Sequence, residues 1–355
     1  MRKLLIIILV LLLLCCKVSA SDEELPTEDL TEGLSDSAIE LLPDPTVDSP
    51  SFWDDMKEVI QNSLKGSFGS VREGLRLCGI LLCIMTLCSV IHLTDLQNKE
   101  SILNVVGALG ICTAITGTLQ SMISLSTGLL EEMSTYGSVL LPALSSVVAM
   151  SGGISSAGAL YAGTVIFSQI LLQLITKLLI PLVYIYLTMA TAEAALGNEM
   201  LSELREFVGW LITKSLRLML YLFLAFTTIT GVIGSTADAA AVKATKAAVS
   251  GMIPVVGSIL SDASDTLLSG AALMKNSVGV FGMLAVMAIC LLPIMKVGVQ
   301  YLLLKITTAV GGTVGLPAHV KLLKEFSKAM GFLLAMCASA ALLLLLGIIC
   351  LMRVT

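Results

Sequence analysis

Residues 251–282 read GMIPVVGSILSDASDTLLSGAALMKNSVGVFG and combine a broken backbone pattern with charge and apolar flanks. Glycine and proline interrupt the stretch, which carries Asp262, Asp265 and Lys275 between two long apolar runs. A charge at bilayer depth is costly and normally faces protein or water. Irregular backbone at that depth is tolerated only where protein or a cavity satisfies its polar groups. The stretch therefore predicts a re-entrant or interfacial element of a polytopic membrane protein.

The composition of the whole chain points the same way. It is 56% hydrophobic and only 13% charged, with a mean hydropathy of +0.95, whereas soluble domains carry about 25% charged residues. We therefore expect an all-α fold, a polytopic transmembrane helix bundle with about seven spans of roughly 20 residues each, plus broken or re-entrant segments. The predicted spans lie at 75–93, 102–125, 154–176, 178–196, 207–233, 277–299 and 329–352.

The first twenty residues have the pattern of a secretory signal peptide. Arg2 and Lys3 precede an apolar run that ends at Cys16, and small residues follow at the cleavage positions. An uncleaved anchor is the main alternative. A lipoprotein signal at Cys15 or Cys16 is disfavoured, because Leu14 is a poor residue before a lipidated cysteine.

Three further regions follow the predicted signal peptide. Residues 21–50 hold ten acidic residues, four prolines and no basic residue, which predicts a disordered acidic leader. Residues 51–74 are amphipathic and predict a helix on the membrane surface. Residues 75–355 form the predicted transmembrane domain.

Proline spacing suggests an internal repeat. Pro142 and Pro181 are 39 residues apart, as are Pro254 and Pro293, and an offset of 112 aligns the two pairs. The candidate repeat units lie near 139–233 and 251–352. Paired broken segments in two halves point to a substrate path in transporter-like folds. The alternative is that apolar, glycine-rich sequence aligns with itself by composition alone.

The broken stretch supplies most of the candidate site residues. Asp262 and Asp265 are three residues apart and would share one helix face. They could line a pore or dock a partner, or they could belong to an interfacial helix with its charges in water. The full candidate set for pore lining or partner docking is Pro254, Gly257, Asp262, Asp265, Gly270, Lys275 and Asn276.

Glu193 and Lys296 interrupt other apolar runs and are candidate intramembrane charges. At depth, Lys296 would need a partner such as Glu193 or Asp262. At a helix end it would only extend its ammonium to the interface, and we favour this interpretation. If the signal peptide places residues 21–74 outside and every later run spans once, four lysines, Lys305, Lys321, Lys324 and Lys328, also lie on the outer side of the membrane. Either a broken segment adds a crossing or one predicted span is therefore wrong.

Sequence signatures of an enzyme are missing. The chain has no Walker motif, no HExxH and no GxSxG, and its two histidines stand alone. The cysteines beyond residue 20 form no CxxC pair, and we interpret them as small apolar residues. We therefore expect no catalytic residue, no cofactor and no metal.

A family resemblance is carried by the same broken stretch. Its motifs are Pro254-Val255-Val256-Gly257, Leu260-Ser261-Asp262-Ala263, Asp265-Thr266, Gly270-Ala271, Lys275-Asn276 and Val278-Gly279. The sequence resembles the stage III sporulation protein AE family over roughly residues 50–355, and the signal peptide, acidic leader and polytopic layout agree with it.

The resemblance implies a setting and a role. Such proteins lie in the outer forespore membrane, which derives from the mother cell, as multi-pass subunits of the stage III A channel or secretion-like complex. The implied partners are the other stage III A operon membrane proteins and ring subunits and, indirectly, a forespore stage II Q protein. A homo-oligomer is a further expectation, and nucleic acid is not an expected partner. The alternative functions are a self-sufficient secondary transporter and a purely structural membrane anchor.

Overall fold

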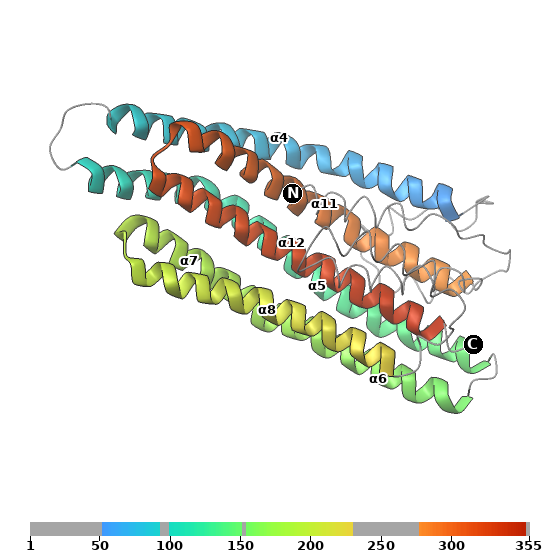
Figure 1. The fold of residues 1–355 in the computed structure, drawn as a ribbon. Coiled ribbons are helices and arrows are strands. Elements are labelled where there is room, and N and C mark those ends of the chain that lie inside the picture. Colours follow the sequence, from blue (N-terminus) through green and yellow to red (C-terminus); the bar gives the residue numbers. More distant parts are fainter. Residues whose placement is uncertain (1–51, 93–98, 151–153, 230–276, 353–355) are drawn as a thin grey trace, which may run out of the picture.

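The structure is a computed structural model, and it describes residues 52–92, 99–150, 154–229 and 277–352. Within these ranges every regular element is a helix, which confirms the predicted all-α polytopic fold (Figure 1). The elements are α4 (Phe52–His92), α5 (Lys99–Met150), α6 (Ile154–Leu174), the π-helical turn η1 (Ile175–Leu179), α7 (Ile180–Leu196), α8 (Glu199–Ile229), α11 (Ser277–Val314) and α12 (Pro317–Met352).

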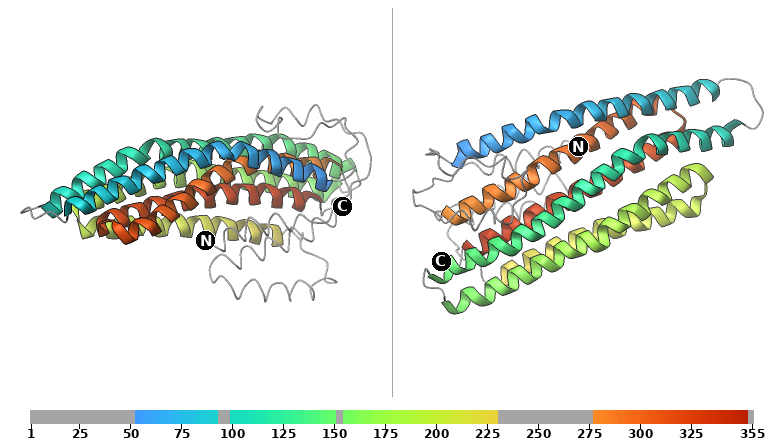
Figure 2. Two further views of the ribbon diagram at one scale, coloured as in Figure 1. Left: turned by 90° about the horizontal axis from the view of Figure 1, so that it is seen from above. Right: turned by 180° about the vertical axis from the view of Figure 1, so that it is seen from behind.

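The helices lie side by side in one elongated bundle (Figures 1 and 2). Helices α4, α7 and α11 end, and α5, α8 and α12 begin, at the same end of the bundle, which we call the turn end. The opposite end, where α4 and α11 begin and α12 finishes, is the far end. The chain thus runs up and down through three antiparallel helix pairs.

Two apolar cores hold these helices together. The main core runs along α5, α7, α8 and α12 and includes Ile111, Ile212 and Leu323, each almost completely buried. The second core lies toward the far end, where Met56 of α4 joins apolar residues of α5, α11 and the last turns of α12. Helix α12 contributes to both cores, as α4, α5 and α11 do, and it is the most buried of the six candidate membrane spans in the described residues.

Six helical segments in the described part of the chain are long and apolar enough to cross a membrane. Helix α5 has 52 residues and is therefore about 78 Å long at 1.5 Å per residue. The hydrocarbon core of a bilayer is only about 30 Å thick. Part of the bundle must therefore stand outside the apolar layer.

One predicted span boundary is wrong. The segments 154–176 and 178–196 form a single helical rod, in which α6 continues through η1 into α7. Lys177 lies at an exposed position of η1 and does not interrupt the helix. The wider π-helical turn accommodates Pro181, which has no N–H to donate to the preceding turn.

The loss of one crossing removes the conflict over the lysines of α12. Lys321, Lys324 and Lys328 lie in the first turns of α12, at the end of the bundle where α4 finishes. If the predicted signal peptide places the start of α4 outside, the turn end lies inside. The lysines then follow the tendency of basic residues to stay on the inner side.

Other boundaries stay predictions. Residues 52–74 continue directly into the rest of α4, so the structure has no helix end near residue 75, and their place on the membrane surface is untested. Pro181 lies in α7 and Pro293 in α11, but Pro254 lies outside the described residues, so the internal repeat stays a prediction. Residues 1–51 and 251–276, which include the signal peptide, the leader and the first part of the second unit, lie outside the described residues.

Candidate functional site

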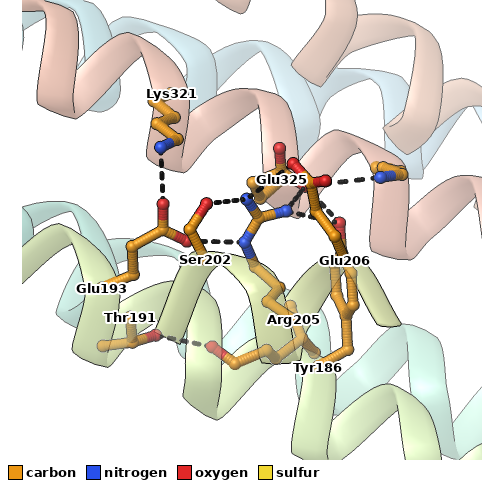
Figure 3. A network of polar contacts seen from close by, with 10 residues as sticks. Tyr186, Thr191, Glu193, Ser202, Arg205, Glu206, Lys321 and Glu325 are labelled. Atoms are coloured by element: carbon orange, nitrogen blue, oxygen red, sulfur yellow. Dashed lines mark hydrogen bonds and ion pairs between the residues drawn. The ribbon is translucent and has the colours of Figure 1, made fainter. Parts of the chain in front are cut away.

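Charged side chains of three helices meet inside the bundle near the turn end (Figure 3). Arg205 of α8 lies between two carboxylates: its Nε is 2.6 Å from Glu193 Oε2 of α7, and its Nη1 is 2.7 Å from Glu325 Oε2 of α12. Lys321 Nζ of α12 is 2.6 Å from Glu193 Oε1. These ion pairs join the α7–α8 pair to α12.

Neutral groups complete what we call the Arg205 cluster. The Tyr186 hydroxyl donates a short hydrogen bond to Glu325 Oε2. Arg205 Nη2 donates to Ser202 Oγ at 3.3 Å, and Nη1 approaches the Tyr186 hydroxyl at 3.4 Å. The Tyr186 ring also lies 5.8 Å from the Arg205 guanidinium and 5.6 Å from the Lys328 ammonium. The cluster therefore consists of Tyr186, Glu193, Ser202, Arg205, Lys321, Glu325 and Lys328.

The local sequence positions these groups. Gly197 adopts a left-handed conformation (φ 66°) and ends α7, which glycine does at little steric cost. Asn198 Oδ1 then accepts a hydrogen bond from the Met200 N–H at 2.9 Å and caps the start of α8. Because this connection is so short, α7 and α8 run antiparallel in contact, and Glu193 meets Arg205 across them.

Burial makes the cluster energetically important. Arg205 is 1% exposed, Glu193 7% and Glu325 8%, so two carboxylates and one guanidinium are withdrawn from solvent. The negative excess is balanced from the rim by Lys321, which is 55% exposed, and more distantly by Lys328. Removal of one partner from such a buried ion pair typically costs about 3–5 kcal/mol, because the remaining charge stays buried without compensation.

A polar cavity of about 680 Å³ adjoins the cluster. Asn104 of α5, Glu203 of α8 and the two carboxylates of the cluster contribute to its wall. In the described part of the chain, no group of three or more His, Cys, Asp or Glu side chains could hold a metal ion. The carboxylates of the cluster are held in ion pairs. The arrangement therefore suits the stabilisation of helix packing better than acid–base chemistry.

Of the two predicted intramembrane charges, Glu193 belongs to the cluster. Its partners are Arg205 and Lys321, and not Lys296 as the sequence suggested. Lys296 does not mark a helix end, because α11 continues to Val314; the extension of its ammonium to the membrane interface stays a prediction. The seven residues proposed from the broken stretch, from Pro254 to Asn276, lie outside the described residues, and their role stays a prediction.

Sequence reasoning missed Arg205, Glu325 and Tyr186. Arg205 and Glu325 each precede a long apolar run in the sequence. A signal was present in the helical spacing: Val208 and Ile212 follow Arg205 on the same helix face, and both are buried. A charge on the apolar face of a helix predicts a buried partner, although it does not say which one.

Lys296 instead contributes to a second cavity of about 800 Å³, which we call the α4–α5 groove. Helices α4 and α5 form its walls, and α11 forms its floor. Small and hydroxyl-bearing side chains predominate on the walls, with one carboxylate on each. The wall residues include Gly66, Gly69, Ser70, Glu73, Ser121, Ser124, Gly128 and Glu132, and the floor includes Ala288, Ile289, Leu292, Pro293 and Lys296.

Comparison with known proteins agrees with this membrane architecture. The family described as stage III sporulation protein AE matches residues 48–355. The stage III sporulation protein AE of Bacillus subtilis (strain 168) is 23% identical over 287 residues, which cover 79% of this chain and 71% of that protein. No solved structure matches. Because the family match covers nearly the whole chain outside the predicted signal peptide and leader, the chain belongs to the stage III sporulation protein AE family.

Proposed function

We propose that the chain is a non-enzymatic membrane subunit of the stage III A channel complex, which would link the mother cell to the forespore. The observation that carries the proposal is the family match over residues 48–355, together with six helices long and apolar enough to cross a membrane. A protein of this kind works by its shape and its contacts in the membrane. Its expected site is the outer forespore membrane, and its expected partners are the other stage III A proteins.

The Arg205 cluster supports a structural part in that role. A subunit of a larger assembly needs a fixed arrangement of its helices, and the cluster fixes α7 and α8 against α12 through paired charges. Buried ion pairs contribute specificity of packing in several systems, even where their net stabilisation is small. The cluster would keep one packing of these helices while neighbouring subunits assemble around them.

Deletion in the organism that encodes the chain tests the proposal. We expect fewer heat-resistant spores, smaller or collapsed forespores in the microscope, and restoration by a plasmid-borne copy. A fluorescent fusion should accumulate in the membrane that surrounds the forespore, and purification in mild detergent should recover other stage III A proteins. Normal spore counts after deletion, or purification of the chain without these partners, would contradict the proposal.

Two further experiments separate the two alternative functions, one with the purified chain and one with variants in the sporulating organism. A self-sufficient transporter should move solute in liposomes that contain only this chain, whereas a subunit of a complex should not. A purely structural anchor should tolerate substitutions in its polar cavities as long as the protein level is unchanged. Reduced sporulation of a stable cavity variant would therefore argue against an anchor.

A further inference from the structure

Two exposed rows of opposite charge run along α8 and α12 near the turn end. We call them the acidic stripe of α8 and the basic stripe of α12. Within each stripe the residues are three and four positions apart, so they share one face of their helix. All six side chains are exposed. The acidic stripe consists of Glu199, Glu203 and Glu206, and the basic stripe consists of Lys321, Lys324 and Lys328.

The two stripes lie at the same level of the bundle. Helices α8 and α12 both begin at the turn end and run in the same direction (Figure 1). Their contacts join residues 120 and 123 positions apart: Arg205 Nη1 is 2.7 Å from Glu325 Oε2, and a Cβ atom at Gly209 would lie 3.6 Å from Phe332 Cζ. The stripe residues have matching separations of 122, 121 and 122 positions in the pairs Glu199–Lys321, Glu203–Lys324 and Glu206–Lys328.

Both stripes also lie on the same side of the bundle. Glu199 and Glu203 from α8 and Lys321 from α12 all line the polar cavity of about 680 Å³. The Arg205 cluster lies between the stripes, with Glu206 and Lys321 at its edges (Figure 3). This side of the bundle therefore presents a negative band directly beside a positive band.

Contacts within the chain leave much of this charge available. Among the described residues, Glu199, Glu203 and Lys324 have no ion-pair partner. Glu206 approaches Arg205 Nη2 only at 4.0 Å, and its side chain is 71% exposed. Lys321 pairs with a carboxylate of the Arg205 cluster, but its side chain is 55% exposed and an ammonium has three donors. The two bands can therefore still pair with charges on another molecule.

We propose that this face is the interface between two copies of the chain, related by a two-fold axis parallel to the helices. Rotation about such an axis preserves the level of every residue and exchanges the two sides of the face. The acidic stripe of each copy then meets the basic stripe of the other. Both copies also keep the same orientation across a membrane. A different protein would have to carry both bands in the reverse order, whereas a second copy presents them in that order after the rotation.

An aromatic pair next to the acidic stripe supplies apolar surface for the same contact. Trp210 lies four residues after Glu206 on the same helix face and is 54% exposed. Its ring stacks on that of Phe207, which is 58% exposed, with centroids 5.9 Å apart. Exposed charge pairs mainly fix orientation, whereas tryptophan often supplies much of the affinity at an interface. We expect Trp210 to contact α12 of the other copy one turn beyond Lys328.

Cross-linking in the membranes of cells that make the full chain tests the contact. Two differently tagged copies are made together, each free of cysteine except for Glu203→Cys in one and Lys324→Cys in the other. A short thiol-specific cross-linker should join the two tags. Leu204→Cys is the matched control for Glu203→Cys, because Leu204 is 41% exposed but points about 100° away around α8. The pair with Glu203→Cys should give severalfold more cross-linked product than the pair with Leu204→Cys, and equal yields would overturn the proposal.

Exchange of the charges tests the pairing itself. Glu203→Lys alone and Lys324→Glu alone should each reduce the dimer fraction severalfold, measured by light scattering of the purified chain in mild detergent at low salt, and both changes in one chain should restore it. Since neither residue has an ion-pair partner within the described residues, the unfolding midpoints should stay close to that of the parent. A dimer that neither reversal weakens would place the contact on another surface and overturn the proposal.

The inference goes beyond the proposed function and does not depend on it. Cross-linking and light scattering require no sporulating cell and no other stage III A protein. A chain that stays monomeric and gives no cross-link above the control would overturn the dimer, although its deletion could still block sporulation. A cross-linked dimer of a chain that is dispensable for sporulation would give the opposite result.

Discussion

Replacement of Arg205 by alanine should be the most destabilising single change in the described part of the chain. The guanidinium is 1% exposed and pairs with two buried carboxylates, at 2.6 Å from Glu193 and 2.7 Å from Glu325. Without it, Glu325 retains only Tyr186 and the Lys328 ammonium at 3.9 Å. We expect a loss of about 3–5 kcal/mol in the free energy of unfolding.

The assay is thermal unfolding of the purified chain in detergent, followed by the exposure of its buried cysteines to a thiol-reactive dye. Six cysteines of the described residues form no disulfide, and three of them are buried, so unfolding should give a clear signal. A loss of this size should lower the midpoint by on the order of 5–10 °C. Arg205→Lys should lower it less, because lysine keeps the charge but cannot pair with both carboxylates in the same way.

Glu206→Ala provides the matched control. Glu206 is the next residue in the sequence and approaches the same guanidinium, but at 4.0 Å and with its side chain 71% exposed. Exposed pairs contribute less than about 1 kcal/mol, so this variant should unfold within a degree or two of the parent. Addition of Glu193→Gln and Glu325→Gln to Arg205→Ala should recover part of the loss, because the orphaned charges disappear. A midpoint for Arg205→Ala equal to that of Glu206→Ala would refute the reasoning.

Three further substitutions probe neighbouring features by the same unfolding assay. Tyr186→Phe removes the hydroxyl that donates to the cluster and should cost about 1–3 kcal/mol, because a buried carboxylate loses a donor; no change would mean that the hydroxyl is dispensable. Gly107→Ala should destabilise the chain, since its Cβ would lie 2.2 Å from the His319 ring, whereas Gly117→Ala, with no atom within 4 Å, should stabilise by up to about 1 kcal/mol; similar midpoints for the two would contradict the predicted close packing. Gly197→Ala places a Cβ at φ 66° and should cost roughly 1 kcal/mol, and Gly197→Asn should cost less; the reverse order would argue against the left-handed cap.

Most of the architecture could be predicted from the sequence because long apolar runs have few structural options in a membrane. Helices satisfy their own backbone polar groups, and run length sets the approximate number of crossings. The error at residues 154–196 came from treating Lys177 as a boundary. A single exposed lysine on a helix can extend its ammonium along the surface, so one charge does not end a helix.

The candidate site could be predicted only in part. Glu193 stood out because a carboxylate in an apolar run requires a partner. The identity of that partner depended on how α8 packs against α7 and α12, and sequence spacing alone does not determine this packing. Arg205 and Glu325 were therefore overlooked. They lie twelve and 132 residues after Glu193 in the sequence, and only the packing of the helices brings them to it. The broken stretch at 251–276, which carried the family resemblance, stays a prediction from sequence.

The π-helical turn between α6 and α7 has a consequence for the phase of every side chain that follows it. Compared with an unbroken α-helix, a turn with i to i+5 bonding holds one extra residue, and each residue advances an α-helix by about 100°. Deletion of one residue from Ile175–Leu179 would rotate Tyr186 and Glu193 by about that angle, away from Arg205. The π-helical turn contains no member of the Arg205 cluster. Its one extra residue nevertheless sets the rotation of α7 at which Tyr186 and Glu193 face Arg205.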